Sequence, residues 1–185
     1  FPKSDLIFFS ARVVAAARDG SEGRGQHMVF QVGEKVVYPN HGVGVIENVS
    51  ARSFGNRYER FYLLRMTCTS LTVMVPMSHA GELRLRRVTR NGEVERVLLF
   101  LSDGICGQRS DWKERFKENS EKMRSGSLLE TAEVLKSLLL LQKSKQLSFR
   151  EKKMLDHARR MLITEVAVSR AIPEVESIAM LQKAL

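Results

Sequence analysis

The chain has 185 residues, of which 43% are hydrophobic and 28% charged, and this composition is typical of a soluble globular protein with one or two small domains. The formal net charge of +9 favours a polyanionic partner such as nucleic acid, with an anionic membrane surface or an acidic protein patch as alternatives. No apolar run reaches the roughly 18 residues that a bilayer span requires, so we expect no membrane span. The two cysteines, Cys68 and Cys106, have no Cys or His at ligand spacing, which argues against a disulfide framework or a zinc site and favours reduced thiols in a cytoplasmic protein.

Residues 1–27 differ in character from the rest of the chain. Leu6–Ala17 is mildly apolar but is interrupted by Arg12, and Asp19–Gln26 is polar and rich in glycine. One interpretation is a weak signal peptide, and the other is an extension upstream of a true start at Met28. Because Arg12 disrupts the apolar stretch, we favour the second interpretation and expect residues 1–27 to be disordered.

Between Val29 and Pro76 apolar residues recur with a period of two, the pattern of half-buried β-strands. The recurring residues are Val43, Val45 and Val49, then Tyr58, Tyr62, Leu64 and Met66, then Leu71, Val73 and Val75. Turn-forming segments separate these runs at 39–42, 55–56 and 67–70. About five short strands in roughly 60 residues are too few for a sandwich, so we predict a small SH3-like or Tudor-like β-barrel over residues 28–82.

Beyond Pro76 the period changes to that of an α-helix. Residues 83–90 form a basic linker that contains Arg84, Arg86, Arg87 and Arg90. A short helix follows over Glu93–Ser102 and then a glycine-containing loop over 103–110. The change of period indicates a second domain, which we place at residues 91–185.

Three further helices are predicted from their start signals. Asp111, Ser127 and Ser148 are each followed three residues later by a glutamate, which is the pattern of a capping box or its Asp variant. Apolar stripes follow the second and third of these caps, at Leu128, Ala132, Leu135 and Leu139 and at Leu155, Ala158, Leu162 and Val166. Pro173 should end the long helix, and 175–185 is a short helix or a frayed tail. The fold class is therefore α+β, a β-barrel followed by an all-α helical bundle.

The sequence of both halves resembles the CarD/CdnL family of bacterial RNA polymerase-binding regulators. The stretch MVFQVGEKVVYPNHGVGVIENV contains F-x-V-G-E-x-V-V-Y-P-x-H-G, a pattern shared with the polymerase-interaction barrel of the transcription-repair coupling factor. The second half contains W-x-x-R-F-K-x-N-x-E-K and a later LS-x-x-E-K-x-ML, which belong to CarD/CdnL alone. The resemblance covers roughly residues 28–170.

The resemblance implies that the barrel pairs with the β subunit of RNA polymerase through an exposed strand edge near the tip of its second hairpin. Arg52 matches a polymerase-contacting arginine of relatives, and Phe54 lies beside it. A second such arginine would fall at Met74, where this sequence departs from the pattern. Either Arg65 compensates for that change or the contact is weaker.

Trp112 is the only tryptophan, and the residues around it admit two interpretations. It packs into the bundle as a core aromatic, or it projects from the helix start as a wedge against unstacked bases in the minor groove. The resemblance favours the wedge, because this position carries the wedge tryptophan of relatives.

Basic residues near Trp112 are candidates for phosphate contacts without sequence readout: Arg115, Lys117, Lys152 and Lys153. The alternative is a solvated helix face with pairs of opposite charge. Glu114 stands where relatives often have a basic residue, which weakens the expectation of strong DNA binding. Charge alone would assign nucleic acid to the first half, since residues 28–90 carry nine basic and four acidic residues and residues 91–185 seventeen and fourteen.

The chain contains no phosphate-binding loop, no His-Glu-x-x-His and no G-x-S-x-G, so we expect no enzymatic activity, cofactor or metal. The resemblance implies a monomeric, nucleoid-associated transcription regulator that binds RNA polymerase and stabilises the promoter open complex at the upstream edge of the bubble. The alternative is an interaction module that docks on polymerase without binding DNA.

Overall fold

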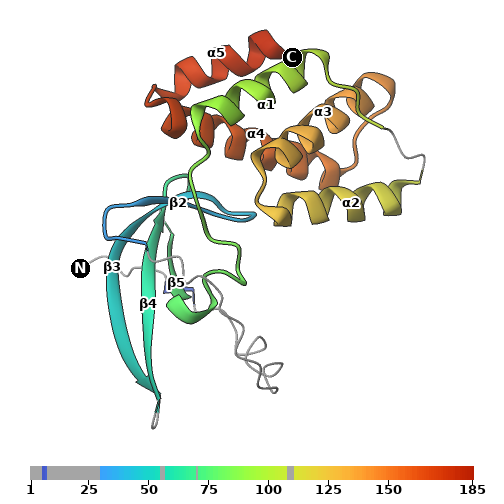
Figure 1. Ribbon diagram of the computed structural model, residues 1–185. Coiled ribbons are helices and arrows are strands. Elements are labelled where there is room, and N and C mark those ends of the chain that lie inside the picture. The colour runs from blue at the N-terminus through green and yellow to red at the C-terminus, as the bar shows by residue number, and fades with distance from the viewer. Residues whose placement is uncertain (1–5, 8–29, 55–56, 70, 108–110) are drawn as a thin grey trace.

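A computed structural model describes residues 6–7, 30–54, 57–69, 71–107 and 111–185. A sheet formed by the first half of the chain lies below five helices formed by the second half (Figure 1). The α+β class predicted from the sequence is therefore confirmed. Of residues 1–27, only Leu6–Ile7 belongs to the described part, so the expectation of disorder there is otherwise not tested.

The sheet has six strands in the order β1-β5-β4-β3-β2-β6. Their bounds are β1 Leu6–Ile7, β2 Lys35–Tyr38, β3 Gly42–Phe54, β4 Arg57–Met66, β5 Thr72–Pro76 and β6 Arg86–Arg87, with a short 3-10 helix, η2, at Met77–His79. β1 pairs with β5 in parallel, and the other pairs are antiparallel. Within the described residues no pairing joins β1 to β6, so the sheet is open and the predicted barrel is not confirmed.

The turn between β2 and β3 lies where the Pro39–Gly42 segment predicts it. Asn40 and Gly42 have φ of 60° and 90°, a left-handed conformation that glycine and asparagine adopt at the least cost. The His41 backbone N–H donates to the Tyr38 carbonyl at 3.0 Å and closes the turn. The turn expected at 55–56 lies outside the described residues.

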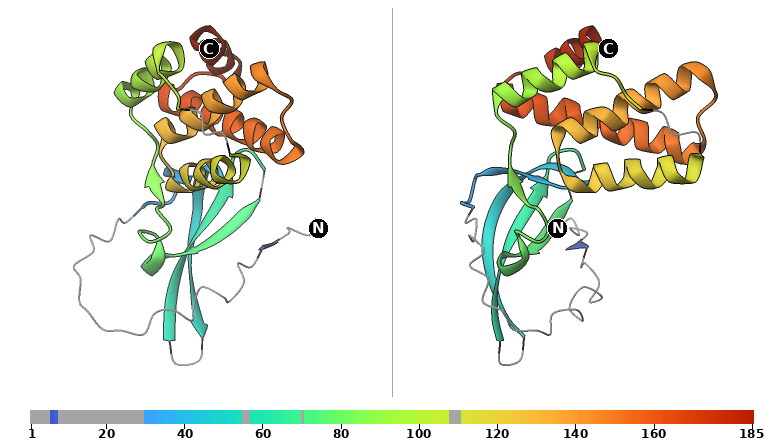
Figure 2. Two further views of the ribbon diagram at one scale, coloured as in Figure 1. Left: turned by 90° about the vertical axis from the view of Figure 1, so that its right-hand side faces the viewer. Right: turned by 45° about the vertical axis from the view of Figure 1, so that its right-hand side comes forward.

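The long β3–β4 hairpin extends beyond the rest of the sheet, away from the helices (Figures 1 and 2). Tyr62, Leu64 and Met66 cover the core face of β4 and are nearly completely buried. Tyr58 has the same parity along the strand, yet it is 82% exposed, because no core lies beneath this part of the hairpin. The period of two groups Tyr58 with the buried Tyr62, and that expectation is wrong.

The helices are α1 Asn91–Asp103, α2 Trp112–Ser125, α3 Leu128–Ser144, α4 Phe149–Arg170 and α5 Glu174–Ala184. The predicted caps Asp111, Ser127 and Ser148 are the N-caps of α2, α3 and α4. Each cap oxygen accepts a backbone hydrogen bond, which satisfies one of the donors that a helix start leaves unpaired. α4 ends at Arg170 and Pro173 instead caps α5, so the C-terminal segment is a helix.

The predicted stripes form the core of the bundle. Leu135, Ala158 and Leu162 are at most 1% exposed and belong to one cluster together with residues of α1 and α5. Leu139 of the predicted stripe is only partly buried, and its neighbour Leu138 is completely buried. A separate cluster on the sheet includes Phe30, Ile46 and Tyr62. Two cores of this kind support the division into an N-terminal and a C-terminal part.

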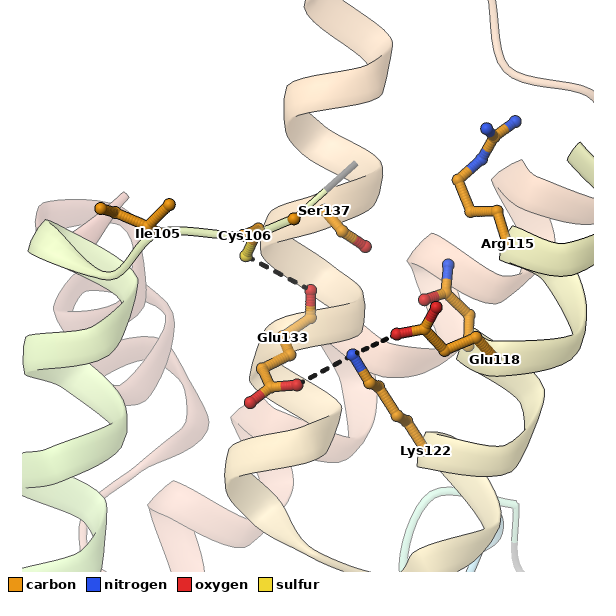
Figure 3. A pocket seen from close by; sticks show the side chains of 9 residues that line it. Ile105, Cys106, Arg115, Glu118, Lys122, Glu133 and Ser137 are labelled. Carbon is orange, nitrogen blue, oxygen red and sulfur yellow. Dashed lines mark hydrogen bonds and ion pairs between the residues drawn. The ribbon is translucent and has the colours of Figure 1, made fainter. Parts of the chain in front are cut away.

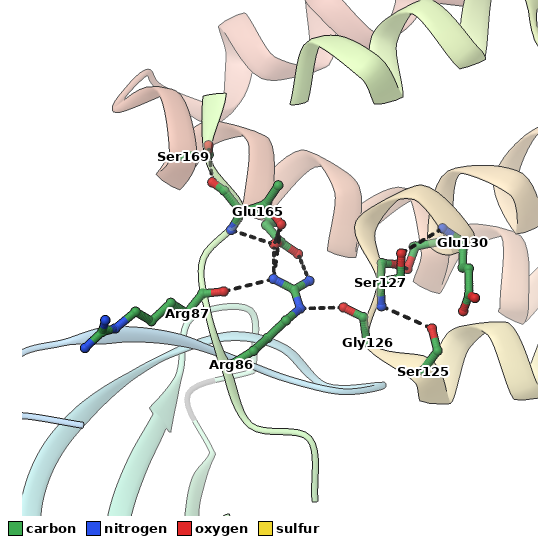
Figure 4. Close-up of polar contacts among 10 residues, drawn as sticks. Arg86, Arg87, Ser125, Gly126, Ser127, Glu130, Glu165 and Ser169 are labelled. Carbon is green, nitrogen blue, oxygen red and sulfur yellow. Dashed lines mark hydrogen bonds and ion pairs between the residues drawn. The ribbon is translucent and has the colours of Figure 1, made fainter. Parts of the chain in front are cut away.

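The segment between sheet and bundle is fixed by a buried carboxylate rather than behaving as a solvated linker. The Arg86 guanidinium donates to both oxygens of Glu165, at 2.6 and 3.0 Å, and to the Gly126 carbonyl at 2.6 Å (Figure 4). Thr89 donates to Glu165 Oε1 through its backbone N–H and its hydroxyl, at 3.2 and 2.5 Å. Glu165 is only 2% exposed, so these hydrogen bonds offset the cost of burying its charge.

Other contacts reinforce this junction. His157 of α4 forms a 2.9 Å hydrogen bond with the Asn40 carbonyl in the β2–β3 turn, and the Ser169 hydroxyl donates to the Thr89 carbonyl at 2.5 Å. Arg87 Nε forms an ion pair with Glu34 Oε1 at 2.7 Å, which links β6 to the segment before β2. The sheet and the bundle are thus joined over several elements.

Among the described helices, none combines the length and the apolar character that crossing a membrane would require. In the same part of the chain, no group of three or more His, Cys, Asp or Glu side chains is arranged to hold a metal ion.

Candidate functional site

The candidate polymerase-binding residues lie on one face of the sheet. Arg52 pairs in register with Glu59, and Met74 pairs with Leu63. Glu59, Leu63 and Arg65 alternate along β4, so Arg52, Arg65 and Met74 share the face opposite the core. Three residues chosen from the sequence are therefore brought to one surface.

These residues differ in exposure and in the contacts that are established for them. Arg52 is exposed. Arg65 is exposed as well, but its guanidinium forms an ion pair with Glu47 at 2.6 Å. Met74 is half-buried, and Phe54 ends β3 with a side chain that lies outside the described residues. Arg65 consequently carries a neutralised charge on this face.

Trp112 is the first residue of α2 and 54% of it is exposed, so the core interpretation is wrong. The Asp111 side chain accepts a hydrogen bond from the Lys113 backbone N–H at 3.3 Å and fixes the start of the helix. The Lys113 ammonium lies 5.9 Å from the centre of the indole ring. The ring is thus presented to solvent from a capped helix end.

Arg115 points the other way and is only 6% exposed. It forms a buried stripe on α2 together with Asn119 and Met123, spaced four residues apart. Its guanidinium donates to Glu151 Oε1 at 3.1 Å. This burial argues against the phosphate contact expected of Arg115, which instead holds the start of α2 against the start of α4.

Glu151 links that ion pair to the capping box of α4. Its Oε2 accepts from the Ser148 backbone N–H at 2.9 Å and from the Ser148 hydroxyl at 2.7 Å. Burial raises the pKa of Glu151, but the hydrogen bonds from Ser148 and Arg115 outweigh it and bring the pKa below its ordinary 4.5. Glu151 is therefore an anion at neutral pH that serves two partners.

An open depression of about 440 Å³ lies between Trp112 and the loop that joins α3 to α4. Lys145, Gln146 and Leu147 form one side of it, and Ser148 forms the start of α4. The Arg115–Glu151 pair also contributes to its lining. The two helix starts are therefore side by side around one concave surface.

The other candidate phosphate-binding side chains are exposed. Lys117 is exposed on α2, and Lys152 and Lys153 are exposed on the first turns of α4, as a phosphate-binding role requires. Lys145, which the sequence reasoning did not single out, is exposed in the loop and lines the depression directly. Lys117, Lys152 and Lys153 do not belong to the lining of the depression, so their role in DNA binding stays a prediction.

A second pocket, of about 140 Å³, lies between α2, α3 and the loop after α1 (Figure 3). Lys122 bridges Glu118 and Glu133 there, at 3.0 Å to each, and Arg115 points away from this group (Figure 3). The pocket is small, and the Lys122–Glu133 ion pair crosses it between α2 and α3. We interpret it as part of the packing that holds α2 in place.

Comparison with known proteins agrees with this organisation. Residues 30–89 match the model of the CarD-like/TRCF RID domain, and residues 96–182 match the model of the CarD C-terminal domain. The chain is also 36% identical over 146 residues to YdeB of Bacillus subtilis (strain 168), which is named a candidate transcription factor. That match covers 79% of this chain and 95% of YdeB. The chain belongs to the CarD/CdnL family of bacterial RNA polymerase-binding transcription regulators. A CarD/CdnL chain has a transcription-related role at RNA polymerase.

The CarD/CdnL motifs acquire a physical meaning from these contacts. The arginine of W-x-x-R-F-K and the glutamate of LS-x-x-E are Arg115 and Glu151, the two partners of the buried ion pair. Sequence reasoning took Arg115 for a surface residue, although its spacing from Met123 placed it on the buried stripe. The motif therefore includes the support of the tryptophan as well as the tryptophan itself.

Sequence reasoning also missed Phe149, the first residue of α4. It is 72% exposed, and the Lys153 ammonium lies 4.6 Å from the centre of its ring. One signal could have found it: Phe149 does not fall on the helical stripe of Leu155, Ala158 and Leu162, so burial in the bundle was not expected.

The Arg115–Glu151 pair predicts a specific dependence of stability on pH. Because the pKa of Glu151 is lowered in the folded chain, its contribution is present above pH 4.5 and is lost as the pH falls through the lower folded value. We expect Glu151→Gln to reduce the free energy of unfolding by about 2 kcal/mol at pH 7 and by progressively less below pH 4.5. Urea unfolding of both proteins between pH 7 and pH 3 measures the difference.

The exposed Glu121 of α2 provides the control for that comparison. Glu121→Gln should leave the free energy of unfolding nearly unchanged at every pH. A difference between wild type and Glu151→Gln that stays constant over the whole range would contradict the assignment.

Proposed function

We propose that this chain docks on the β subunit of RNA polymerase through its sheet and stabilises the promoter open complex with Trp112, which contacts DNA at the upstream edge of the bubble. The observation that carries the proposal is the 54% exposure of this tryptophan at a capped helix start, next to basic side chains. A large aromatic side chain normally gains stability from burial, so an exposed one calls for a partner.

The docking half of the proposal rests on the β3–β4 hairpin. β2 pairs with β3 only as far as Val45, so among the described strands residues 48–54 of β3 have β4 as their neighbour on one side. An open strand edge offers backbone hydrogen bonds to a partner strand, and adjacent side chains provide selectivity. Arg52 on this stretch is the proposed selective contact, with Phe54 at its end and Arg65 and Met74 farther along the same face.

Charge reversal at the hairpin tests the docking contact. We expect Arg52→Glu to reduce capture of a β-subunit fragment by tenfold or more, because a carboxylate would replace the proposed cationic contact. Arg160→Glu is the matched control, since Arg160 is exposed on α4 and the net charge changes equally. Equal capture by wild type and Arg52→Glu in a pull-down would exclude Arg52 from the docking surface.

The proposed DNA contact requires only a modest stacking free energy from Trp112. Stacking of one aromatic ring on a base contributes about 1–3 kcal/mol, whereas unstacking one base step costs a few kcal/mol. The ring therefore cannot open a promoter by itself. It can slow the collapse of a bubble that polymerase has already opened, by about tenfold to a hundredfold.

Basic side chains near the ring would bind the phosphate backbone and orient the protein without reading sequence. Lys117, Lys152 and Lys153 are the proposed phosphate contacts, because all three are exposed near the starts of α2 and α4. Arg115 is proposed to support Trp112 through its pair with Glu151. Promoter choice would then depend on polymerase and on how readily the DNA opens.

The lifetime of the open complex tests the proposed contact between Trp112 and DNA. We expect wild-type protein to lengthen it about tenfold or more and Trp112→Ala to abolish most of that effect, because the stacking surface is lost while docking is kept. Competitor-challenge kinetics on a defined promoter measures the lifetime. No lengthening by wild type would contradict the proposed function.

A second function, docking on polymerase without DNA contact, is favoured by Glu114. This acidic residue is exposed in the first turn of α2, beside Trp112, where it would repel phosphate. If wild type and Trp112→Ala lengthened the open-complex lifetime equally, this second function would replace the first.

A further inference from the structure

Phe149 is a large apolar side chain that the fold does not use. It is the first residue of α4 and is 72% exposed, a greater exposure than that of Trp112. Its neighbour Leu147 is 4% exposed and belongs to the bundle core, so the local backbone could have buried an apolar group here. An exposed phenyl ring lacks the roughly 2 kcal/mol of stabilisation that its burial would contribute, so its presence at this position needs another explanation.

The surroundings of Phe149 are basic. Arg150, Lys152 and Lys153 are exposed next to it on α4, and Lys145 is exposed in the preceding loop. The one acidic side chain in this turn, Glu151, is buried and bound to Arg115 and Ser148. The surface around the ring therefore carries a net positive charge that complements a polyanion.

Phe149 is also close in sequence to the depression beneath Trp112. It follows Ser148 directly, and Ser148 lines that depression together with Trp112. Both rings occupy the first position of a helix, and the Arg115–Glu151 pair joins those two helix starts. Two exposed aromatic residues are thus carried by two helix starts that contact each other.

We propose that Phe149 is a second base-stacking residue, which binds an unpaired base of the strand that Trp112 contacts at the edge of the bubble. This inference rests on the proposed function. Aromatic side chains within a basic groove are the usual means of holding single-stranded nucleic acid, since every base offers a face for stacking. Lys153, 4.6 Å from the ring centre, covers the ring in the free protein and would turn to a phosphate on binding.

Binding of the full-length chain to forked DNA tests the proposal. The probes are a fluorescent duplex that ends in unpaired strands and a fully paired duplex of the same length, compared by anisotropy at low salt. We expect Phe149→Ala to weaken binding to the fork about fivefold or more and binding to the paired duplex less than twofold. Phe149→Trp should retain the preference for the fork, and Phe149→Leu should lose it, because leucine is apolar but cannot stack.

The matched control is Val175→Ala, which truncates an equally exposed apolar residue near the start of α5. It should leave both affinities unchanged. Wild-type affinity of Phe149→Ala for the fork, or an equal loss on both DNAs, would overturn the role of Phe149. If Trp112→Ala still weakened fork binding in that case, the proposed function would stand without Phe149. Wild type that bound neither DNA would overturn stacking by Phe149 in this assay, and the open-complex lifetime would then decide the proposed function by itself.

Discussion

The carboxylate of Glu165 is buried where the sheet meets the bundle, and its hydrogen bonds come from Arg86 and Thr89 on the connecting segment. Burying a carboxylate is costly unless its hydrogen bonds are satisfied, and removing its partners costs several kcal/mol. A hinge motion that separated the two halves would break these bonds together with the Arg86 contact to Gly126. The buried pair therefore specifies one orientation of the sheet relative to the helices.

That orientation gives α2 a defined role. Its C-terminal end, at Gly126, contacts the junction, and its 14 residues extend about 21 Å to Trp112. The Arg115–Glu151 pair then fixes the far end against α4. Docking through the sheet would deliver the indole ring to a set distance from the docking surface, so that the affinity of the sheet for polymerase makes a weak stacking contact effective.

Local signals in the sequence predicted much of this arrangement. The caps Ser127 and Ser148 depend on neighbouring residues, and they were assigned correctly. The period of two located the strands but not every face of β3, because a bulge after Ile46 shifts the register, and Ile46 rather than Val45 is buried and pairs with Leu64. The junction could not be predicted, because Arg86 belongs to a basic run that looks solvated and its partner lies 79 residues away. Tyr58 was misassigned because burial depends on whether a core lies beneath the position, which periodicity alone does not reveal. Arg115 was misassigned because its charge suggested a surface position, although its helical spacing from Met123 places it on the buried stripe.

If the sheet and the bundle form one rigid unit, the distance between spin labels on the two halves has a single value. Labels at Ala51→Cys on the hairpin and Glu121→Cys on α2, both exposed positions, would be introduced after Cys68→Ser and Cys106→Ser. Pulsed electron–electron double resonance should give a single narrow distance distribution, which broadens when Glu165→Ala removes the buried carboxylate. A broad or multiple distribution with Glu165 intact would show that the sheet and the bundle move relative to each other, and would contradict a rigid junction.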